Sequence, residues 1–267
     1  MIEKRLIPRL VFFYIFAMVI ATVFDYDISK NIANVHLTWA KVLEIAGEPP
    51  ALLFTAFNFS LLCSYTVKKK KYPLLALCAL GAFVASCYAV GRTFDYIVGS
   101  WHFCISVPVG GVIALALILI LLKQKEEFIN KYARTAACCV AAALTVLVVV
   151  SFMKQLWGRV RFRQLLEDSS LSFTDWYIIN GFGNPSHVSF PSGHTANACV
   201  IFMIQLYFPK QRKWLTPVLF AYIAAMGISR IFVGAHYLSD VLTGAAISLF
   251  ICELWSGMIK RKKTNEV

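Results

Sequence analysis

Long runs of apolar residues separated by short polar segments dominate the chain. A run of about 20 apolar residues can cross the roughly 30 Å hydrocarbon core of a bilayer as a helix. The pattern predicts about eight membrane spans, with six to eight possible: 10–24, 51–67, 73–91, 105–122, 136–153, 194–208, 214–231 and 238–258. The expected fold is therefore all-α, a polytopic membrane helical bundle formed by one domain over residues 1–267.

Composition supports this fold class. Hydrophobic residues make up 59% of the chain, whereas soluble domains are about 45–50% apolar. The mean hydropathy is +0.67 over the 267 residues. The excess of apolar residues is spread along the whole chain, so no separate soluble domain is expected.

Positive charge follows the predicted loops and indicates an orientation. The chain holds 26 Lys and Arg and has a formal net charge of +12. Of these residues, 18 lie in alternate segments, which are 1–9, 68–72, 123–135, 209–213 and 259–267. Because cytoplasmic loops carry such an excess, we predict a multi-pass cell-membrane protein with both termini in the cytoplasm. The excess of basic residues is thus explained by orientation in the bilayer, and it gives no reason to expect nucleic acid as a partner.

The remaining basic residues and the histidines fall on the predicted outer side. Eight of the 26 Lys and Arg lie outside the segments named above, and five of these eight come late in the chain: Lys154, Arg159, Arg161, Arg163 and Arg230. All five histidines lie outside or at outer span ends: His36, His102, His187, His194 and His236. Cations and imidazoles gathered at helix ends indicate an anion site. Phosphate is the natural candidate, because it offers several acceptor oxygens and negative charge.

The first candidate stretch is KQLWGRVR, from Lys154 to Arg161. Seven residues make nearly two helical turns, so we expect Lys154 and Arg161 to share a helix face, with Gly158 between them. The small glycine would let a ligand or another helix approach. Taken alone, the stretch also fits interfacial snorkelling of long basic side chains.

The second stretch is PSGH, from Pro191 to His194. Ser192 is well placed to cap the sixth predicted span. Free backbone N–H groups at such a helix start, including that of Gly193, form an anion cradle. His194 would stand beside the bound group and could donate a proton. A plain helix cap with an interfacial histidine explains the stretch equally well.

The third stretch is SRIFVGAHYLSD, in which Arg230 ends the seventh predicted span and His236 opens the eighth. Gly234 helps the chain reverse between them. His236 and Asp240 are four residues apart, so the carboxylate can hold one imidazole nitrogen and leave the other free. Such a histidine is prepared to act as a nucleophile or base. A capping aspartate and a packed histidine are the alternative.

Together the three stretches resemble the type 2 phosphatidic acid phosphatase superfamily, which includes lipid phosphate phosphatases, glucose-6-phosphatase and the vanadium haloperoxidases. The family pattern is Lys-x6-Arg-Pro, then Pro-Ser-Gly-His, then Ser-Arg-x5-His-x3-Asp, and the chain follows this order within a motif-bearing core of about 136–258. Phe162 replaces the family proline. Arg159 and Arg163 lie outside the pattern and are candidates to touch a second phosphate or a headgroup. Five predicted spans precede the first motif, where six-span members have three.

The resemblance implies a role for each matching residue. His236 would attack phosphorus and form a phosphohistidine, with Asp240 orienting it, and His194 would protonate the leaving alcohol and then activate water. The residues that would bind the phosphoryl oxygens are Lys154, Arg161, Ser192, Gly193 and Arg230. No cofactor and no metal are expected, since the outer segments show no cluster of carboxylates to hold one.

The predicted function is hydrolysis of a lipid phosphate or diphosphate at the outer membrane face. Phosphatidic acid, phosphatidylglycerophosphate and an isoprenyl diphosphate are all candidate substrates, and the sequence leaves protein partners open. A lipid phosphotransferase using the same site and a phosphatase for a soluble sugar phosphate remain alternatives. A haloperoxidase fits less well, because the site faces lipid. An alternative from another class of protein is an anion transporter, which would also explain the outer cationic patch.

Overall fold

The structure, a computed structural model, describes residues 7–183 and 185–264. Within these ranges the chain forms helices and no strand. The α-helices and the 3-10 helices (η) follow the chain in this order: α1 Ile7–Ile32, α2 Thr38–Ala46, α3 Pro49–Lys68, α4 Tyr72–Val98, α5 Phe103–Leu122, α6 Glu126–Trp157, α7 Phe162–Glu167, α8 Gly193–Val200, η1 Ile201–Leu206, η2 Pro209–Gln211, α9 Arg212–Phe232 and α10 Leu238–Thr264.

Seven segments of the described chain are long and apolar enough to cross a bilayer. They are Ile7–Ile32, Thr38–Lys68, Tyr72–Val98, Phe103–Leu122, Glu126–Glu167, Pro209–Phe232 and Leu238–Ile259. This number lies within the predicted six to eight. The prediction of an all-α membrane bundle is confirmed.

The stretch expected as a sixth span, 194–208, is not a continuous α-helix. α8 ends at Val200, and the chain continues as the 3-10 helix η1 to Leu206. A 3-10 helix rises about 2.0 Å per residue against about 1.5 Å in an α-helix, so the two elements together extend about 24 Å. Hydropathy indicates that such a stretch is buried in an apolar environment, but it does not distinguish the two kinds of helix.

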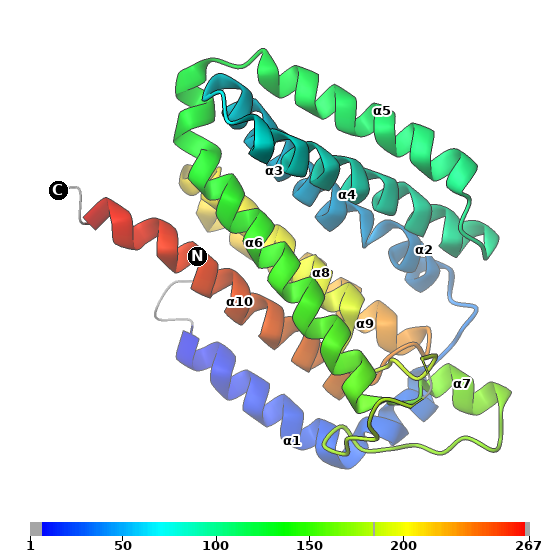
Figure 1. Cartoon of the computed structure of the whole chain (residues 1–267). Coiled ribbons are helices and arrows are strands. Elements are labelled where there is room, and N and C mark those ends of the chain that lie inside the picture. The colour runs from blue at the N-terminus through cyan, green and yellow to red at the C-terminus, as the bar shows by residue number, and fades with distance from the viewer. Residues whose placement is uncertain (1–6, 184, 265–267) are drawn as a thin grey trace.

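The helices form two groups that meet at α6 (Figure 1). On one side α3, α4 and α5 pack against one another, and on the other side α8, α9 and α10 pack together. α1 lies along α10, and the short α2 lies against α9. The largest buried apolar cluster of the described chain joins α6 and η1 to the second group, and it includes Val146, Phe202, Met226 and Cys252. This core holds the start of α8 next to the ends of α6 and α9.

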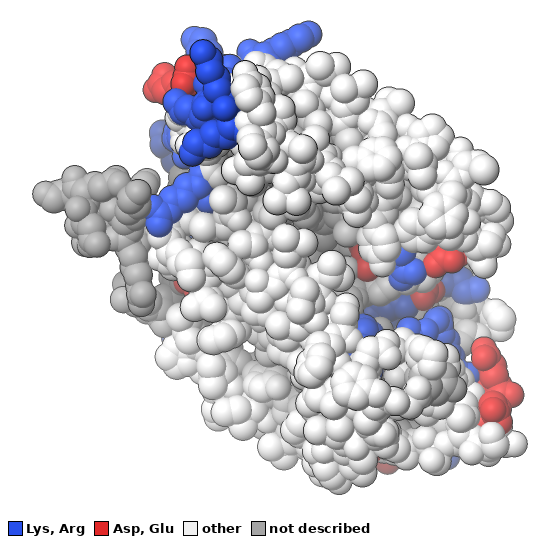
Figure 2. Space-filling view, viewed as in Figure 1, with Lys and Arg blue, Asp and Glu red and all other residues white. Residues whose placement is uncertain are grey.

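The surface in view has broad flanks without Lys, Arg, Asp or Glu, and two charged regions (Figure 2). Basic side chains gather at one end, where the α3–α4 turn (68–71) and the α5–α6 turn lie. A hollow on the other side of the view holds both acidic and basic side chains. Exposed apolar residues on the helices include Phe12, Leu77, Val112 and Phe250, as lipid-facing surfaces require. The predicted inner segments 1–9 and 259–267 fall partly outside the described residues.

Gly244 of α10 provides a test of how closely α10 and α8 pack. A Cβ at position 244 would collide with the carbonyl oxygen of Ser192, at which α8 begins. We expect Gly244→Ala to lower the free energy of unfolding by about 1–3 kcal/mol, the usual cost of overpacking. Thermal unfolding in detergent measures the change. Gly257→Ala on the same helix is the control, because a Cβ there meets no atom within 4 Å. Equal effects of the two substitutions would contradict the proposed contact.

Candidate active site

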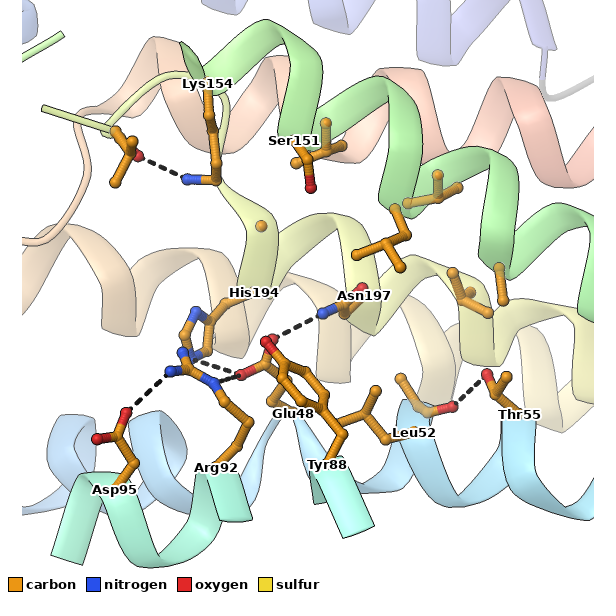
Figure 3. Close-up of a pocket in the computed structure, with 18 of the residues that line it drawn as sticks. Glu48, Leu52, Thr55, Tyr88, Arg92, Asp95, Ser151, Lys154, His194 and Asn197 are labelled. Atoms are coloured by element: carbon orange, nitrogen blue, oxygen red, sulfur yellow. Dashed lines mark hydrogen bonds and ion pairs between the residues drawn. The ribbon is translucent and has the colours of Figure 1, made fainter. Parts of the chain in front are cut away.

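A cavity of about 840 Å³ is lined by residues from all three candidate stretches. These residues are Lys154, Arg161, Gly193, His194, Arg230 and His236. In the close-up view, Lys154 extends from α6 on one side, and His194 of α8 faces α3 and α4 on the other (Figure 3). Segments far apart in sequence therefore contribute basic and imidazole groups to one space.

Lys154 and Arg161 reach the cavity by a different route from the one expected. They do not share a helix face, because α6 ends at Trp157 and Gly158 adopts a left-handed φ of 54°. Glycine adopts this conformation without steric cost, and it commonly ends a helix. Arg161 is then extended, with a ψ of 150°, and precedes α7. Lys154 donates a hydrogen bond from Nζ to the carbonyl oxygen of Val188 at 2.6 Å, which holds the ammonium at the cavity edge.

The start of α8 agrees with the predicted helix cap. Ser192 is the N-cap residue, and its hydroxyl accepts a hydrogen bond from the backbone N–H of Thr195. The Ser192 side chain is buried beside Thr195 and does not line the cavity, whereas Gly193 and His194 do. A Cβ at position 193 would lie 3.3 Å from Cε of Lys154. The glycine therefore allows the lysine to approach the helix start.

The ring of His236 is held by the backbone. Gly234 turns the chain with a φ of 64°, and Nδ1 of His236 then lies 2.6 Å from the carbonyl oxygen of Ser189. A carbonyl oxygen only accepts, so Nδ1 carries the proton and Nε2 keeps its lone pair. Oδ2 of Asp240 is more distant, at 3.6 Å from Nδ1.

His236 lies outside the seven candidate spans. Burial lowers its pKa to about 3, with the nearby cations Lys154 and Arg230 acting in the same direction and Asp240 opposing them. The imidazole is therefore neutral at neutral pH. A neutral ring with a free Nε2 is the form that can act as a nucleophile.

Asp240 does not line the cavity and is the centre of a buried network behind it. Its Oδ1 accepts a hydrogen bond from Nη1 of Arg159 at 2.6 Å. Its Oδ2 accepts from the hydroxyl of Ser189 at 2.5 Å and from the backbone N–H of Tyr237 at 2.8 Å. Arg159 also donates from Nη2 to Oδ2 of Asp25 in α1 at 2.9 Å. The network joins α1, the turn after α6 and the start of α10.

Arg159 and Arg163 have different environments, although both were candidates for a second phosphate. Arg159 is fully buried in the network, its guanidinium 4.2 Å from the ring centroid of Tyr237, and it is not among the cavity residues. The expectation that it could touch a ligand is therefore wrong for this structure. Arg163 does line the cavity, and its Nη1 lies 3.5 Å from a Glu44 oxygen.

Several nitrogens at the polar end of the cavity lack partners among the described residues. They are Nε of Arg161 and Nε and Nη1 of Arg230, and all of them are buried. A buried donor without a partner costs about 1–3 kcal/mol. A tetrahedral anion with several acceptor oxygens would satisfy these groups, and guanidinium groups match phosphate well. The arrangement can thus hold a phosphoryl group beside both histidines.

Three carboxylates also line the cavity: Glu44, Glu48 and Asp95. Glu44 accepts a hydrogen bond from Nη2 of Arg230 at 2.6 Å. Glu48 accepts from Nε of Arg92 at 3.2 Å, and Asp95 from Nη1 of the same arginine at 3.0 Å. In the described chain, no group of three or more His, Cys, Asp and Glu residues could hold a metal ion. Sequence reasoning missed these three carboxylates. Their position beside apolar runs could have indicated them, because an ionised group there is costly unless it has a partner.

Known proteins resemble the part of the chain that carries the three candidate stretches. Residues 135–263 match the family model of the PAP2 superfamily. The chain carries a PAP2 superfamily domain. The matched region begins within α6, so α1 to α5 precede it.

Three relatives of this chain are lipid phosphatases by name. Phosphatidylglycerophosphatase B of Bacillus subtilis is 31% identical over 86 residues, which cover 29% of this chain and 42% of the relative. Lipid A 1-phosphatase of Rhizobium etli is 33% identical over 103 residues, covering 37% of this chain and 39% of the relative. Lipid A 4′-phosphatase of Bacteroides thetaiotaomicron is 30% identical over 162 residues, covering 56% of this chain and 66% of the relative.

The chain thus spans about two fifths of the length of the first two relatives. No solved structure matches it.

Phe162, which replaces the family proline in the PAP2 domain, lies at a position that suits either residue. It is the first residue of α7, where proline is common because that N–H has no partner within the helix. The extended Arg161 is also the conformation favoured before proline. Here the phenylalanine ring is buried and makes edge contacts with Tyr26 and Tyr237. The departure therefore adds packing without altering the turn.

The buried network around Arg159 and Asp240 predicts a large effect of removing Arg159. Arg159→Met would leave Asp25 and Asp240 buried without their cation, so we expect the free energy of unfolding to fall by about 3–5 kcal/mol. Lys69→Met removes the exposed ion pair with Glu126 and should leave the unfolding midpoint almost unchanged. Thermal or denaturant unfolding in detergent compares the two. A small effect at Arg159 would contradict the structural role of the network.

Proposed function

We propose that this PAP2 protein is a metal-independent phosphatase that hydrolyses a lipid phosphate or diphosphate through a phosphohistidine intermediate. The observation that carries the proposal is the cavity, in which the free Nε2 of His236, the imidazole of His194 and unpaired guanidinium nitrogens line one space. The names of the relatives support the same reaction class.

In the first step, Nε2 of His236 forms a bond to phosphorus, and the bond from phosphorus to the ester oxygen breaks. His194 gives a proton to the departing oxygen, so an alcohol leaves rather than an alkoxide. Lys154, Arg161 and Arg230 stabilise the charge on the phosphoryl oxygens during the transfer, and the backbone N–H of Gly193 assists them. Fixed cations supply most of the catalysis in phosphoryl transfer, which is why no metal is needed here.

In the second step, a water oxygen attacks phosphorus and the bond to Nε2 of His236 breaks. The neutral His194 takes a proton from the water, which restores the starting protonation state and releases inorganic phosphate. Asp240 takes no part in proton transfer in this scheme. It orients His236 through the Ser189 segment, to which both residues are hydrogen-bonded.

A lipid substrate suits the shape of the cavity. Apolar residues of α3, α4 and α6 extend its lining away from the histidines: Leu52, Phe59, Val84, Leu144 and Leu147. An acyl or isoprenyl chain could lie along this wall while its phosphate reaches the cations. Phosphatidic acid, phosphatidylglycerophosphate and isoprenyl diphosphates are candidate substrates, and the relatives' names add lipid A.

We also propose that the site is on the outer side of the cell membrane and that both termini are cytoplasmic. The concentration of Lys and Arg in alternate loops supports this orientation. Labelling of single cysteines introduced into the α3–α4 turn and at the exposed His36, with an impermeant reagent on whole cells, would test it. Reaction at the turn and not at position 36 would reverse the assignment.

Phosphate release from a panel of these lipids, without added metal, tests the proposed reaction. We expect His236→Ala to lower kcat by about 1000-fold or more, because no other group can form the intermediate. A rapid quench with a phosphorus-labelled lipid should give protein-bound label that is stable to alkali and lost in acid, and none in the variant. His36→Ala is the matched control, since His36 is exposed and does not line the cavity. Activity that survives His236→Ala would eliminate the proposed nucleophile.

The same assay separates the alternatives. Transfer of label to an added acceptor lipid would indicate a phosphotransferase, and hydrolysis restricted to sugar phosphates would indicate a soluble substrate. Uptake of labelled phosphate into vesicles without hydrolysis would favour an anion transporter.

A further inference from the structure

Glu48 faces the imidazole of His194 at the wall of the cavity. Oε2 of Glu48 lies 3.7 Å from Nε2 of His194, and both side chains are almost completely buried. Figure 3 shows the carboxylate between His194 on α8 and Arg92 on α4. Nε2 of His194 has no hydrogen-bond partner in the part of the chain that the structure describes. A small movement of either side chain would therefore let a protonated Nε2 of His194 donate a hydrogen bond to Oε2 of Glu48.

Two hydrogen bonds hold Glu48 in this place, and a third fixes the residue before it. Nδ2 of Asn197 donates to its Oε1 at 2.7 Å, and Nε of Arg92 donates to its Oε2 at 3.2 Å. Asn197 follows His194 by three residues on α8, so the two side chains leave the helix on the same side. Although Glu48 stands at the N-cap of α3, its side chain does not cap that helix. The preceding Gly47 is fixed through its carbonyl oxygen, which accepts a hydrogen bond from the hydroxyl of Tyr222.

His194 needs such a partner because the surrounding charge opposes its protonation. The cations that line the cavity with it are Arg92 of α4, Lys154 of α6, Arg161 and Arg163 near α7, and Arg230 of α9. The other titratable groups lining the cavity are Glu44, Tyr88, Asp95, Tyr96 and His236. Burial, together with Arg230 and the other nearby cations, lowers the pKa of His194 well below its usual range. A leaving alkoxide nevertheless needs a proton donor.

The other acidic groups are poorly placed to support the charged imidazole. The ion pairs of Glu44 and Asp95 among the described residues are with arginines and not with His194: Glu44 is bonded to Arg230, and Asp95 is bonded to Arg92. The hydroxyl of Tyr96 accepts a hydrogen bond from Nη2 of Arg92, and its ring makes an edge contact with the His194 ring. Among the described residues, Glu48 is the carboxylate that forms an ion pair with His194.

We propose that Glu48 is the positioning residue for the general acid: it accepts a hydrogen bond from Nε2–H of the His194 imidazolium and so directs Nδ1–H toward the leaving oxygen. The proposal rests on the phosphatase function proposed above. Nδ1 gives up its proton as the phosphorus–oxygen bond breaks and regains one from water in the second step, and Glu48 exchanges no proton in either step. Glu48 lies outside the region that matches the PAP2 family model, so the family motifs do not assign it this role.

Two substrates with different leaving groups test this role. Dodecyl phosphate releases a basic alkoxide that needs a proton, whereas a nitrophenyl phosphate with a dodecyl tail releases a stable phenolate. We expect Glu48→Gln to lower kcat for the alkyl ester by about 10- to 100-fold and for the aryl ester by no more than about twofold. The fall of the alkyl-ester kcat at high pH should also move to lower pH, since a neutral amide stabilises the imidazolium less than a carboxylate does.

Further variants complete the test. Asp95→Asn removes another carboxylate bonded to Arg92 and should leave the ratio of the two activities unchanged. In a His194→Gln background, Glu48→Gln should add little further loss, because the two residues act as one unit. Should Glu48→Gln not fold, Glu48→Asp takes its place. The shorter side chain keeps the negative charge but places it farther from His194, so kcat should fall for the alkyl ester alone.

Equal loss with both esters, or an unmoved pH profile, would overturn the role of Glu48 while leaving the phosphatase function intact. If the wild-type protein hydrolyses neither ester and none of the lipid panel, the proposed function fails, and the Glu48 proposal fails with it.

Discussion

The ion pair between Arg159 and Asp240 is the constraint on which the candidate site depends. Both side chains are fully buried, and breaking such a pair from one side costs far more than the pair contributes as a whole. Through hydrogen bonds to Asp25 and Ser189, the same two residues tie α1, the turn after α6, the segment before α8 and the start of α10 together. The cavity residues are positioned by a framework that lies behind them, so their own polar atoms remain available for a ligand.

Charge within the cavity follows a simple balance. Five cations line it, Arg92, Lys154, Arg161, Arg163 and Arg230, against three carboxylates, Glu44, Glu48 and Asp95. The excess of two positive charges matches a phosphate monoester, which carries between one and two negative charges at neutral pH. Buried charge without compensation is costly, so the carboxylates make an otherwise strongly cationic cavity tolerable in a membrane protein. They also restrict which guanidinium nitrogens stay free, and these are Nε and Nη1 of Arg230 and Nε of Arg161.

Much of the architecture was predictable, because hydropathy, helix caps and motif spacing act locally. Apolar runs predicted the helical bundle, and Ser192 and Gly234 behave as their residue types suggest. Other features depend on contacts between distant residues. Gly158 ends α6 in a left-handed conformation, which the sequence permits but does not require. The contacts of Asn197 and Tyr222 with the Gly47–Glu48 segment join positions roughly 150 or more residues apart, and a single sequence carries no signal for such pairs. Lys154 and Arg161 meet at the cavity for reasons of loop geometry and not helical periodicity.

The hydrogen bond from His236 to the Ser189 carbonyl has a consequence for how robust the site is. A peptide carbonyl neither gains nor loses a proton over the range in which proteins remain folded, so the tautomer of His236 does not depend on the ionisation of an acceptor. Nor can any replacement of the Ser189 side chain delete that acceptor, since it belongs to the main chain. Variation of the surrounding residues can therefore tune the reactivity of the imidazole while the identity of its exposed nitrogen is preserved.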